Sequence, residues 1–313
     1  MLTRSLFSIA SPAGKRGRLS ILIFHRVFAQ PDPIFPQEMH AQRFDVLCGW
    51  LKSWFNVLPL DLAVRHLKSG SLPARAACIT FDDGYADNHD VALPILQRHG
   101  LPATFFIATG FLDGGRMWND TVIESVRLSA SSVLDLGALG CFAIRTPQEK
   151  AVAIAAIIRQ IKYMPGAERL ATTEGIASTA HVQPPGNLMM TSAQVKAMRH
   201  ANMQIGAHTV SHPILARLSD DQARAEMRGS KDFLEHLLGG RVGLFAYPNG
   251  KPGEDYNAQS VALAQEIGFD AAVSTHWGAA RARCDLFQVP RFTPWDRARL
   301  GFSARMAANL FRG

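Results

Sequence analysis

Short apolar runs alternate with segments of helical periodicity along most of this 313-residue chain. We expect buried strands at 20–24, 76–81, 103–108, 203–207, 243–246, 271–275 and, shorter, 286–289. A Ser or Thr followed three residues later by Glu or Gln predicts helix starts at Thr146, Thr191 and Ser219. Repeated strand–helix units favour a parallel sheet with helices outside it. About seven strands suit an α/β fold of the deformed (β/α) barrel type better than an open sheet.

One stretch breaks this alternation. Residues 111–190 are too long for a plain loop, and we expect an insertion that covers one end of the barrel. The predicted organisation is a basic segment at 1–19, a single barrel domain at 20–295 that includes the insertion, and a basic C-terminal helix at 296–313. Trp118, in the insertion, is either part of a sugar site or a packed core residue.

Positive charge is concentrated at the two ends of the chain. The net charge is +7; residues 1–20 hold four basic residues and no acidic one, and residues 281–313 hold seven arginines and two aspartates. Such ends are suited to peripheral contact with an anionic membrane or an acidic glycan. The plainer interpretation is a solvated N-terminal tail and a packed final helix. The buried face of that helix would comprise Leu300, Met306, Leu310 and Phe311.

The remaining composition excludes several classes of protein. The four cysteines are far apart and form no C-x-x-C pair, which fits free thiols in a reducing compartment. No apolar run approaches the ~20 residues of a transmembrane helix, and residues 1–20 lack the order of a signal peptide. We therefore expect a cytoplasmic protein, with the inner face of the membrane as a peripheral location. No nucleic-acid motif is present, so no nucleic acid partner is expected, and no feature indicates an oligomeric state.

Two short motifs place metal-binding side chains at the ends of predicted strands. Asp82 and Asp83 follow the strand 76–81, and His208 follows 203–207 with His212 four residues later. Taken alone, an Asp-Asp-Gly sequence is usually a turn, and a pair of histidines four apart is often a helix face. In parallel α/β proteins, however, catalytic residues gather at the carboxyl ends of strands. Two His and one Asp can hold a divalent metal, which leaves the other Asp as a general base for hydrolysis; this argument does not decide which Asp is which.

Residues 20–295 resemble the polysaccharide deacetylases of carbohydrate esterase family four. The specific segments are Thr80-Phe81-Asp82-Asp83-Gly84-Tyr85 and His208-Thr209-Val210-Ser211-His212-Pro213, with a weaker match at Phe245-Ala246-Tyr247-Pro248-Asn249-Gly250. Two further segments resemble a bacterial subgroup associated with exopolysaccharide synthesis: Ile23-Phe24-His25-Arg26 and Leu286-Phe287-Gln288-Val289-Pro290-Arg291.

The resemblance implies a role for each matched residue. Asp83, His208 and His212 would hold a divalent metal, and Asp82 would be the catalytic base. The backbone N–H of Tyr247 would help to bind the oxyanion. Zinc is the first expectation for the metal, although two His and one Asp also suit Co²⁺, Ni²⁺, Fe²⁺ or Mn²⁺.

The sequence departs from the family pattern at two places. Ala246 stands where the family has an arginine that contacts the catalytic aspartate, and Arg291 is the expected substitute. The family's late histidine, which acts as the general acid, has no counterpart near the C-terminus. His25 and His276 are the candidates for that role, and each could instead be a structural histidine.

The function implied by the resemblance is metal-dependent hydrolysis of N-acetyl groups on the amino sugars of a poly- or oligosaccharide. An N-acetylated glycan is then the expected partner. Two alternatives stay open: a deacylase or deformylase of a lipid-linked sugar at the cytoplasmic membrane face, motivated by the basic ends, and a catalytically silent carbohydrate-binding barrel, motivated by the two departures.

Overall fold

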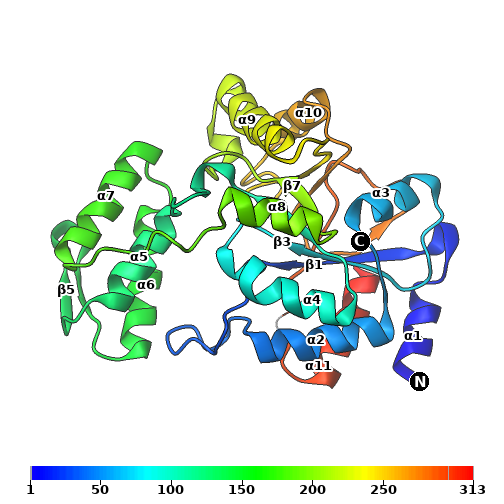
Figure 1. Cartoon of the computed structure of the whole chain (residues 1–313), viewed down its shortest axis with the longest axis horizontal. Coiled ribbons are helices and arrows are strands. Elements are labelled where there is room, and N and C mark those ends of the chain that lie inside the picture. The colour runs from blue at the N-terminus through cyan, green and yellow to red at the C-terminus, as the bar shows by residue number, and fades with distance from the viewer. Residues whose placement is uncertain (1, 295, 313) are drawn as a thin grey trace.

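A computed structural model describes residues 2–294 and 296–312 (Figure 1). Its strands are β1 Arg18–Phe24, β2 Asn56–Val57, β3 Ala76–Phe81, β4 Thr104–Ile107, β5 Val133–Asp135, β6 Cys141–Ala143, β7 Gln204–Ala207, β8 Leu244–Ala246, β9 Ala271–Val273 and β10 Ala280–Arg281. Its α-helices are α1 Leu2–Ala10, α2 Ala41–Trp54, α3 Leu60–Ser69, α4 Leu93–His99, α5 Trp118–Leu128, α6 Pro147–Ile161, α7 Gly166–Thr179, α8 Ser192–His200, α9 Asp220–Leu238, α10 Ala258–Glu266 and α11 Arg299–Phe311. A π-helical turn at Asn88–Ala92 precedes α4.

A curled, mainly parallel sheet organises the molecule. Its strand order is β10-β1-β3-β4-β7-β8-β9, with β2 paired to β3, and β10 alone runs antiparallel to its neighbour. The predicted strand at 286–289 forms no regular strand, but it hydrogen-bonds to β9: Ala272 N–H donates to Leu286 O, and Val289 N–H donates to Ala272 O. Further along, Phe292 N–H donates to Ile21 O in β1. This segment therefore bridges the two ends of the sheet, and the deformed barrel that the sequence predicted is confirmed.

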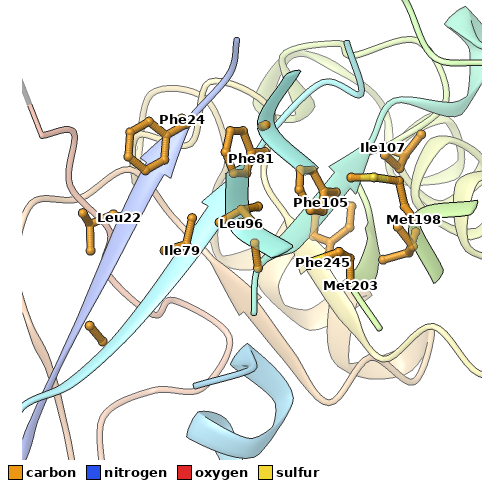
Figure 2. Close-up of a cluster of buried hydrophobic side chains, with 14 of the residues drawn as sticks. Leu22, Phe24, Ile79, Phe81, Leu96, Phe105, Ile107, Met198, Met203 and Phe245 are labelled. Atoms are coloured by element: carbon orange, nitrogen blue, oxygen red, sulfur yellow. The ribbon is translucent and has the colours of Figure 1, made fainter. Parts of the chain in front are cut away.

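Aromatic and aliphatic side chains fill the space between the sheet and the helices around it. Figure 2 shows part of this core, in which the Phe81 ring lies 5.3 Å from that of Phe24 and 4.8 Å from that of Phe105. Helix α2 presents buried residues at helical spacing, including Phe44, Leu47 and Leu51, which explains why this segment is helical and which face it packs. The three predicted capping boxes are all present, at the starts of α6, α8 and α9.

Helices α5, α6 and α7 and the hairpin β5–β6 form a separate lobe at the left of Figure 1. This lobe has its own hydrophobic cluster, which includes Val126, Ile154, Ile157, Ile161 and Ile176. It occupies the stretch that the sequence marked as an insertion, and α5 borders the barrel. Trp118 does not lie free in a sugar site, because Arg169 covers its ring at 4.8 Å and it packs against the lobe core. The predicted domain boundaries themselves stay a prediction.

Both chain ends differ in part from expectation. The solvated N-terminal tail was wrong for residues 2–10, which form α1, since Phe7 is buried against the Trp54 and Phe55 rings. In α11, Met306 and Leu310 are buried as predicted. Leu300 and Phe311 are exposed, and Phe302 and Asn309 take the inward positions instead. No helix among residues 2–294 and 296–312 has both the length and the apolar character needed to cross a membrane.

Candidate active site

Two adjacent aspartates at the carboxyl end of β3 contact different partners. Asp82 continues the sheet, since its N–H donates to Phe24 O of β1 at 2.9 Å. Asp83 then adopts φ +74°, in the left-handed region that non-glycine residues rarely occupy. This turn directs the two buried carboxylates to different sets of side chains: Asp82 meets Arg291, and Asp83 meets the two predicted histidines. Backbone strain of this kind typically costs ~1–3 kcal/mol and concentrates at functional sites.

Asp83, His208 and His212 form a compact set of metal-type ligands. Asp83 Oδ1 lies 3.5 Å from His208 Nε2 and 3.4 Å from His212 Nε2. One ligand atom from each residue falls within 4.8 Å of the others. Residues 2–294 and 296–312 contain no other cluster of three such residues with this geometry.

The hydrogen bonds around this triad fit a bound cation. His208 Nδ1–H donates to Ala246 O at 2.7 Å, which leaves Nε2 facing Asp83 with a lone pair. Asp83 Oδ1 is buried and has no hydrogen-bond partner among the described residues, although such an atom normally has one. A divalent cation would satisfy this oxygen, and the donor set of two imidazoles and a carboxylate suits zinc and related ions.

The protonation states of the three side chains also bear on metal binding. Burial alone would raise the pKa of Asp83, but the His208 and His212 rings hold that pKa well below its usual range. Burial lowers the pKa of His212 to about 4, so this ring is neutral at pH 7. Burial would likewise lower the pKa of His208, but the two aspartates raise it overall. A proton on His208 Nε2 and a metal ion would compete for the same lone pair.

Arg291 supplies the partner of Asp82 that Ala246 cannot. Its Nη1 and Nη2 lie 2.7 and 2.8 Å from the two carboxylate oxygens of Asp82, and neither side chain is more than 3% exposed. Arg291 Nε donates to Ser274 O at 3.0 Å, and Nη1 also reaches Thr80 Oγ1 at 3.1 Å, so the guanidinium is fixed. Burial would raise the pKa of Asp82, but the Arg291 charge keeps this pKa below its usual value. Asp82 is therefore ionised and held in one orientation.

The loop that carries His212 is held by a residue that sequence reasoning missed. The Glu226 side chain, on α9, accepts hydrogen bonds from Val210 N–H at 2.9 Å, from Ser211 N–H at 2.8 Å and from Ser211 Oγ at 2.6 Å. Thr209 Oγ1 accepts from His212 N–H at 3.1 Å. Thr209 and His212 have φ values of +65° and +53°, so these bonds stabilise a strained turn.

The two candidate acids occupy different places. His25 is exposed and lines a cavity of about 300 Å³ together with Asp83. The side chain of His276 is exposed and is not part of the lining of this cavity, although its backbone O accepts from Arg291 N–H at 3.1 Å. The structure thus brings His25, and not His276, to the metal-type cluster.

Tyr247 does not match the role expected of it. Its backbone N–H donates to Val273 O of β9 at 3.2 Å, because the residue extends the ladder between β8 and β9. An N–H engaged in the sheet is not free for an oxyanion, so that expectation is wrong for this geometry. The Tyr247 ring is fully buried, stacked on Tyr256 at 3.9 Å, with its hydroxyl donating to Phe287 O. Its place here is structural.

Comparison with known proteins identifies the family. The family model described as polysaccharide deacetylase matches residues 69–128 and 163–272, more than half of the chain. This chain belongs to the polysaccharide deacetylase family. The gap between the two matched ranges, residues 129–162, covers the β5–β6 hairpin and α6, so this part of the lobe lies outside the family's common pattern.

Individual relatives support the same assignment at lower similarity. The Bacillus subtilis protein YxkH, named as a candidate polysaccharide deacetylase, is 21% identical over 279 residues, or 88% of this chain and 71% of that protein. The poly-β-1,6-N-acetyl-D-glucosamine N-deacetylase of Staphylococcus aureus is 30% identical over 102 residues, which span 32% of this chain and 35% of that enzyme. The structure of IcaB from Ammonifex degensii superimposes with a TM-score of 0.61 at 17% identity, covering 96% of this chain and 98% of that one. At this identity the superposition establishes the shared fold.

Proposed function

We propose that this deacetylase-family protein is a zinc-dependent hydrolase that removes N-acetyl groups from the amino sugars of a poly- or oligosaccharide. One observation carries the proposal: the Asp83–His208–His212 cluster lies beside a second carboxylate, Asp82, that is ionised but belongs to a separate pair with Arg291. A metal site with a free base next to it is the equipment for amide hydrolysis.

Asp83, His208 and His212 would hold the metal. When bound, zinc would polarise the acetyl carbonyl and make a water molecule acidic enough to attack it near neutral pH. Asp82 takes the proton from that water through one of its carboxylate oxygens. Arg291 keeps Asp82 ionised beforehand and oriented throughout, because both of its Nη groups are bonded to that carboxylate.

The departing amine requires a proton, and His25 is the proposed donor. It is the candidate histidine that shares a cavity with Asp83, and it is exposed enough to exchange protons with water. An imidazole ring can both donate and accept a proton, which suits it to this role.

The substrate is proposed to be an exopolysaccharide of N-acetylated hexosamine. The named activity of the Staphylococcus aureus relative, a poly-β-1,6-N-acetyl-D-glucosamine N-deacetylase, supports this class of glycan. The family membership supports deacetylation of a carbohydrate more broadly.

Metal stoichiometry combined with acetate release tests the proposal. Wild type, His208→Ala and a control, His200→Ala, are equilibrated with zinc, desalted and analysed for metal; His200 is exposed at the end of α8. We expect about one zinc per chain in wild type and control, none in His208→Ala, and acetate release from N-acetylglucosamine oligomers only where zinc is retained. Zinc retention with tight glycan binding but no acetate release would favour the silent carbohydrate-binding barrel.

A further inference from the structure

The cavity beside Asp83 takes most of its lining from three parts of the chain, and Thr293 completes it. Its volume is about 300 Å³, at the small end of the ~300–1,000 Å³ typical of ligand pockets, so it suits a single ring. The segment after β1 contributes His25, Arg26 and Phe28, the loop after β3 contributes Asp83 and Tyr85, and α5 of the lobe contributes Asp120. Asp83 belongs both to the metal-type cluster and to the wall of this cavity. A substrate whose acetyl group lies at the cluster would therefore extend into the cavity.

Arg26 is a cation of the cavity wall that is held by one carboxylate and two aromatic rings. Its Nε donates to Asp87 Oδ2 at 2.8 Å, and Asp87 Oδ1 in turn accepts from Val27 N–H at 3.1 Å. The guanidinium lies 4.4 Å from the Phe28 ring and 4.5 Å from the Tyr85 ring. The two rings and the carboxylate fix the plane of the guanidinium, and the two Nη groups have no hydrogen-bond partner within residues 2–294 and 296–312. A fixed donor with unused N–H groups loses little conformational entropy on binding.

We propose that Arg26 is a substrate-binding residue, whose Nη groups donate hydrogen bonds to a ring or hydroxyl oxygen of the sugar that carries the acetyl group. This assignment rests on the proposed function, since it places the acetyl group at the metal cluster and the sugar ring in the adjoining cavity. The rings of Phe28 and Phe35 in the same wall offer apolar surface to the C–H faces of such a ring.

The charges around Arg26 indicate that this sugar is neutral. Asp87 already balances the Arg26 charge at 2.8 Å, and Arg127 is paired with Asp32 and Glu124. Three further carboxyl groups line the cavity: Glu38, Asp83 and Asp120. A uronate or phosphate placed there would face these groups while both arginines of the wall are already paired, and like charges at close range repel each other. A polyhydroxylated neutral ring can use both the Arg26 donors and the carboxyl acceptors.

Steady-state kinetics on the zinc-loaded full chain test this assignment. The variants are Arg26→Lys, which keeps the charge but loses the paired Nη donors, and the control Arg98→Lys, an exposed arginine paired with Asp45 on the outside of the barrel. The substrates are β-1,4- and β-1,6-linked N-acetylglucosamine tetramers and a C6-carboxylate form of each. For Arg26→Lys on the neutral tetramers, we expect KM to rise about tenfold or more, as for loss of a charged hydrogen bond, with kcat and zinc content close to wild type.

A second variant separates binding from structural support. In Arg26→Ala, added methylguanidinium should restore a low KM, which a purely structural defect would not allow. An unchanged KM in Arg26→Lys, a loss confined to kcat, or wild-type preference for the carboxylate forms would overturn the assignment. If wild type binds glycan but releases no acetate, the proposed function fails, and calorimetric Kd values for wild type and Arg26→Lys still decide the role of Arg26. Absence of saturable glycan binding by wild type would remove the sugar from this cavity.

Discussion

The barrel rim and the helical lobe each place a buried carboxylate near the site, and the two environments are opposite. Asp82, on the rim, is 3% exposed and forms two hydrogen bonds with the Arg291 guanidinium. Asp120, on α5 of the lobe, is 2% exposed, accepts one hydrogen bond from the Tyr85 hydroxyl, and leaves its Oδ2 without a partner among the described residues. Burial raises the pKa of Asp120 to about 7, whereas Arg291 outweighs burial and lowers the pKa of Asp82.

This difference assigns the two regions different tasks. A carboxylate that is already ionised and oriented by two hydrogen bonds is prepared to accept a proton. Asp120 lies outside the metal-type cluster, where it accepts a hydrogen bond from Tyr85 and forms part of the cavity wall. The barrel therefore carries the chemistry, and the lobe shapes the space beside it. The following predictions test this division, beginning with the largest effect.

Replacing the proposed base should nearly abolish activity without removing the metal. In Asp82→Asn, acetate release should fall by ~10²–10⁴-fold, the usual contribution of a general base. The zinc content should stay that of wild type, because the three ligands are unchanged. Asp120→Asn, the matching change in the lobe, should reduce kcat far less. Comparable kcat losses in the two variants would end the division of tasks.

The Arg291–Asp82 ion pair should contribute more to the free energy of unfolding than an ion pair of the lobe. Removing one partner of a fully buried ion pair typically costs ~3–5 kcal/mol, because the other charge is left uncompensated. Arg291→Ala should lose about this much free energy of unfolding in urea titrations. Arg127→Ala, which breaks the pair between the lobe and Asp32, should lose less because the Arg127 side chain is 22% exposed. An equal loss of unfolding free energy in the two variants would show that the buried Arg291–Asp82 pair contributes no more to stability than the partly exposed Arg127–Asp32 pair.

Sequence reasoning succeeded for the placement of side chains that directly follow predicted strands. The positions of Asp82, Asp83 and His208 follow from strand ends, which apolar runs predict well, and the parallel sheet brings those ends together. The approach of Arg291 to Asp82 was expected from the ending motif, although nothing local in the sequence specifies a contact across 209 residues.

The failures share a cause: they concern contacts set by tertiary packing. Glu226 resembles any helix-surface glutamate in sequence, and only the packing of α9 shows that it holds the His212 loop. In the lobe, the aromatic residue Trp118 drew the functional hypothesis, but Asp120, two residues later on the same helix, lines the cavity. Leu300 illustrates the same limit at the C-terminus, where composition predicted a buried residue and the helix phase exposed it.

The two carboxylates should affect stability in different pH ranges. The folded-state pKa of Asp120 is raised to about 7, so its contribution is fully present below its unfolded pKa of roughly 3.9 and is lost as pH rises through 7. The pKa of Asp82 is lowered, so its contribution is present above roughly pH 3.9 and is lost only as pH falls further. Between these limits, Asp120→Asn should gain stability relative to wild type as pH rises, while the difference between Asp82→Asn and wild type stays flat.

Urea unfolding of metal-free protein across this range measures both slopes. The metal is removed because a bound cation would itself favour the ionised form of nearby carboxyl groups. A constant difference between Asp120→Asn and wild type from about pH 4 to 7 would mean that the lobe carboxyl is ionised throughout, and the contrast with Asp82 would disappear.

We expect the smallest effect from Glu226, which holds the loop that carries His212. Glu226→Gln keeps the size of the side chain but removes its negative charge, so the Val210 and Ser211 N–H groups, which both donate to Oε2, would have only a weaker neutral acceptor. Residues behind metal ligands typically contribute 10–100-fold to metal affinity, and we expect zinc binding to weaken toward the lower end of that range, near tenfold. The control is Glu266→Gln. Glu266 is exposed at the end of α10 and pairs with Arg224, which lies on α9 as Glu226 does. Competition with a chromogenic chelator gives the zinc Kd, and urea unfolding of the metal-free proteins separates local from global effects. Weaker zinc binding by Glu226→Gln at an unchanged free energy of unfolding would show that the barrel site depends on contacts behind its ligands, which Asp120 in the lobe lacks. Equal zinc Kd values in the two variants would show that the metal ligands need no support from Glu226.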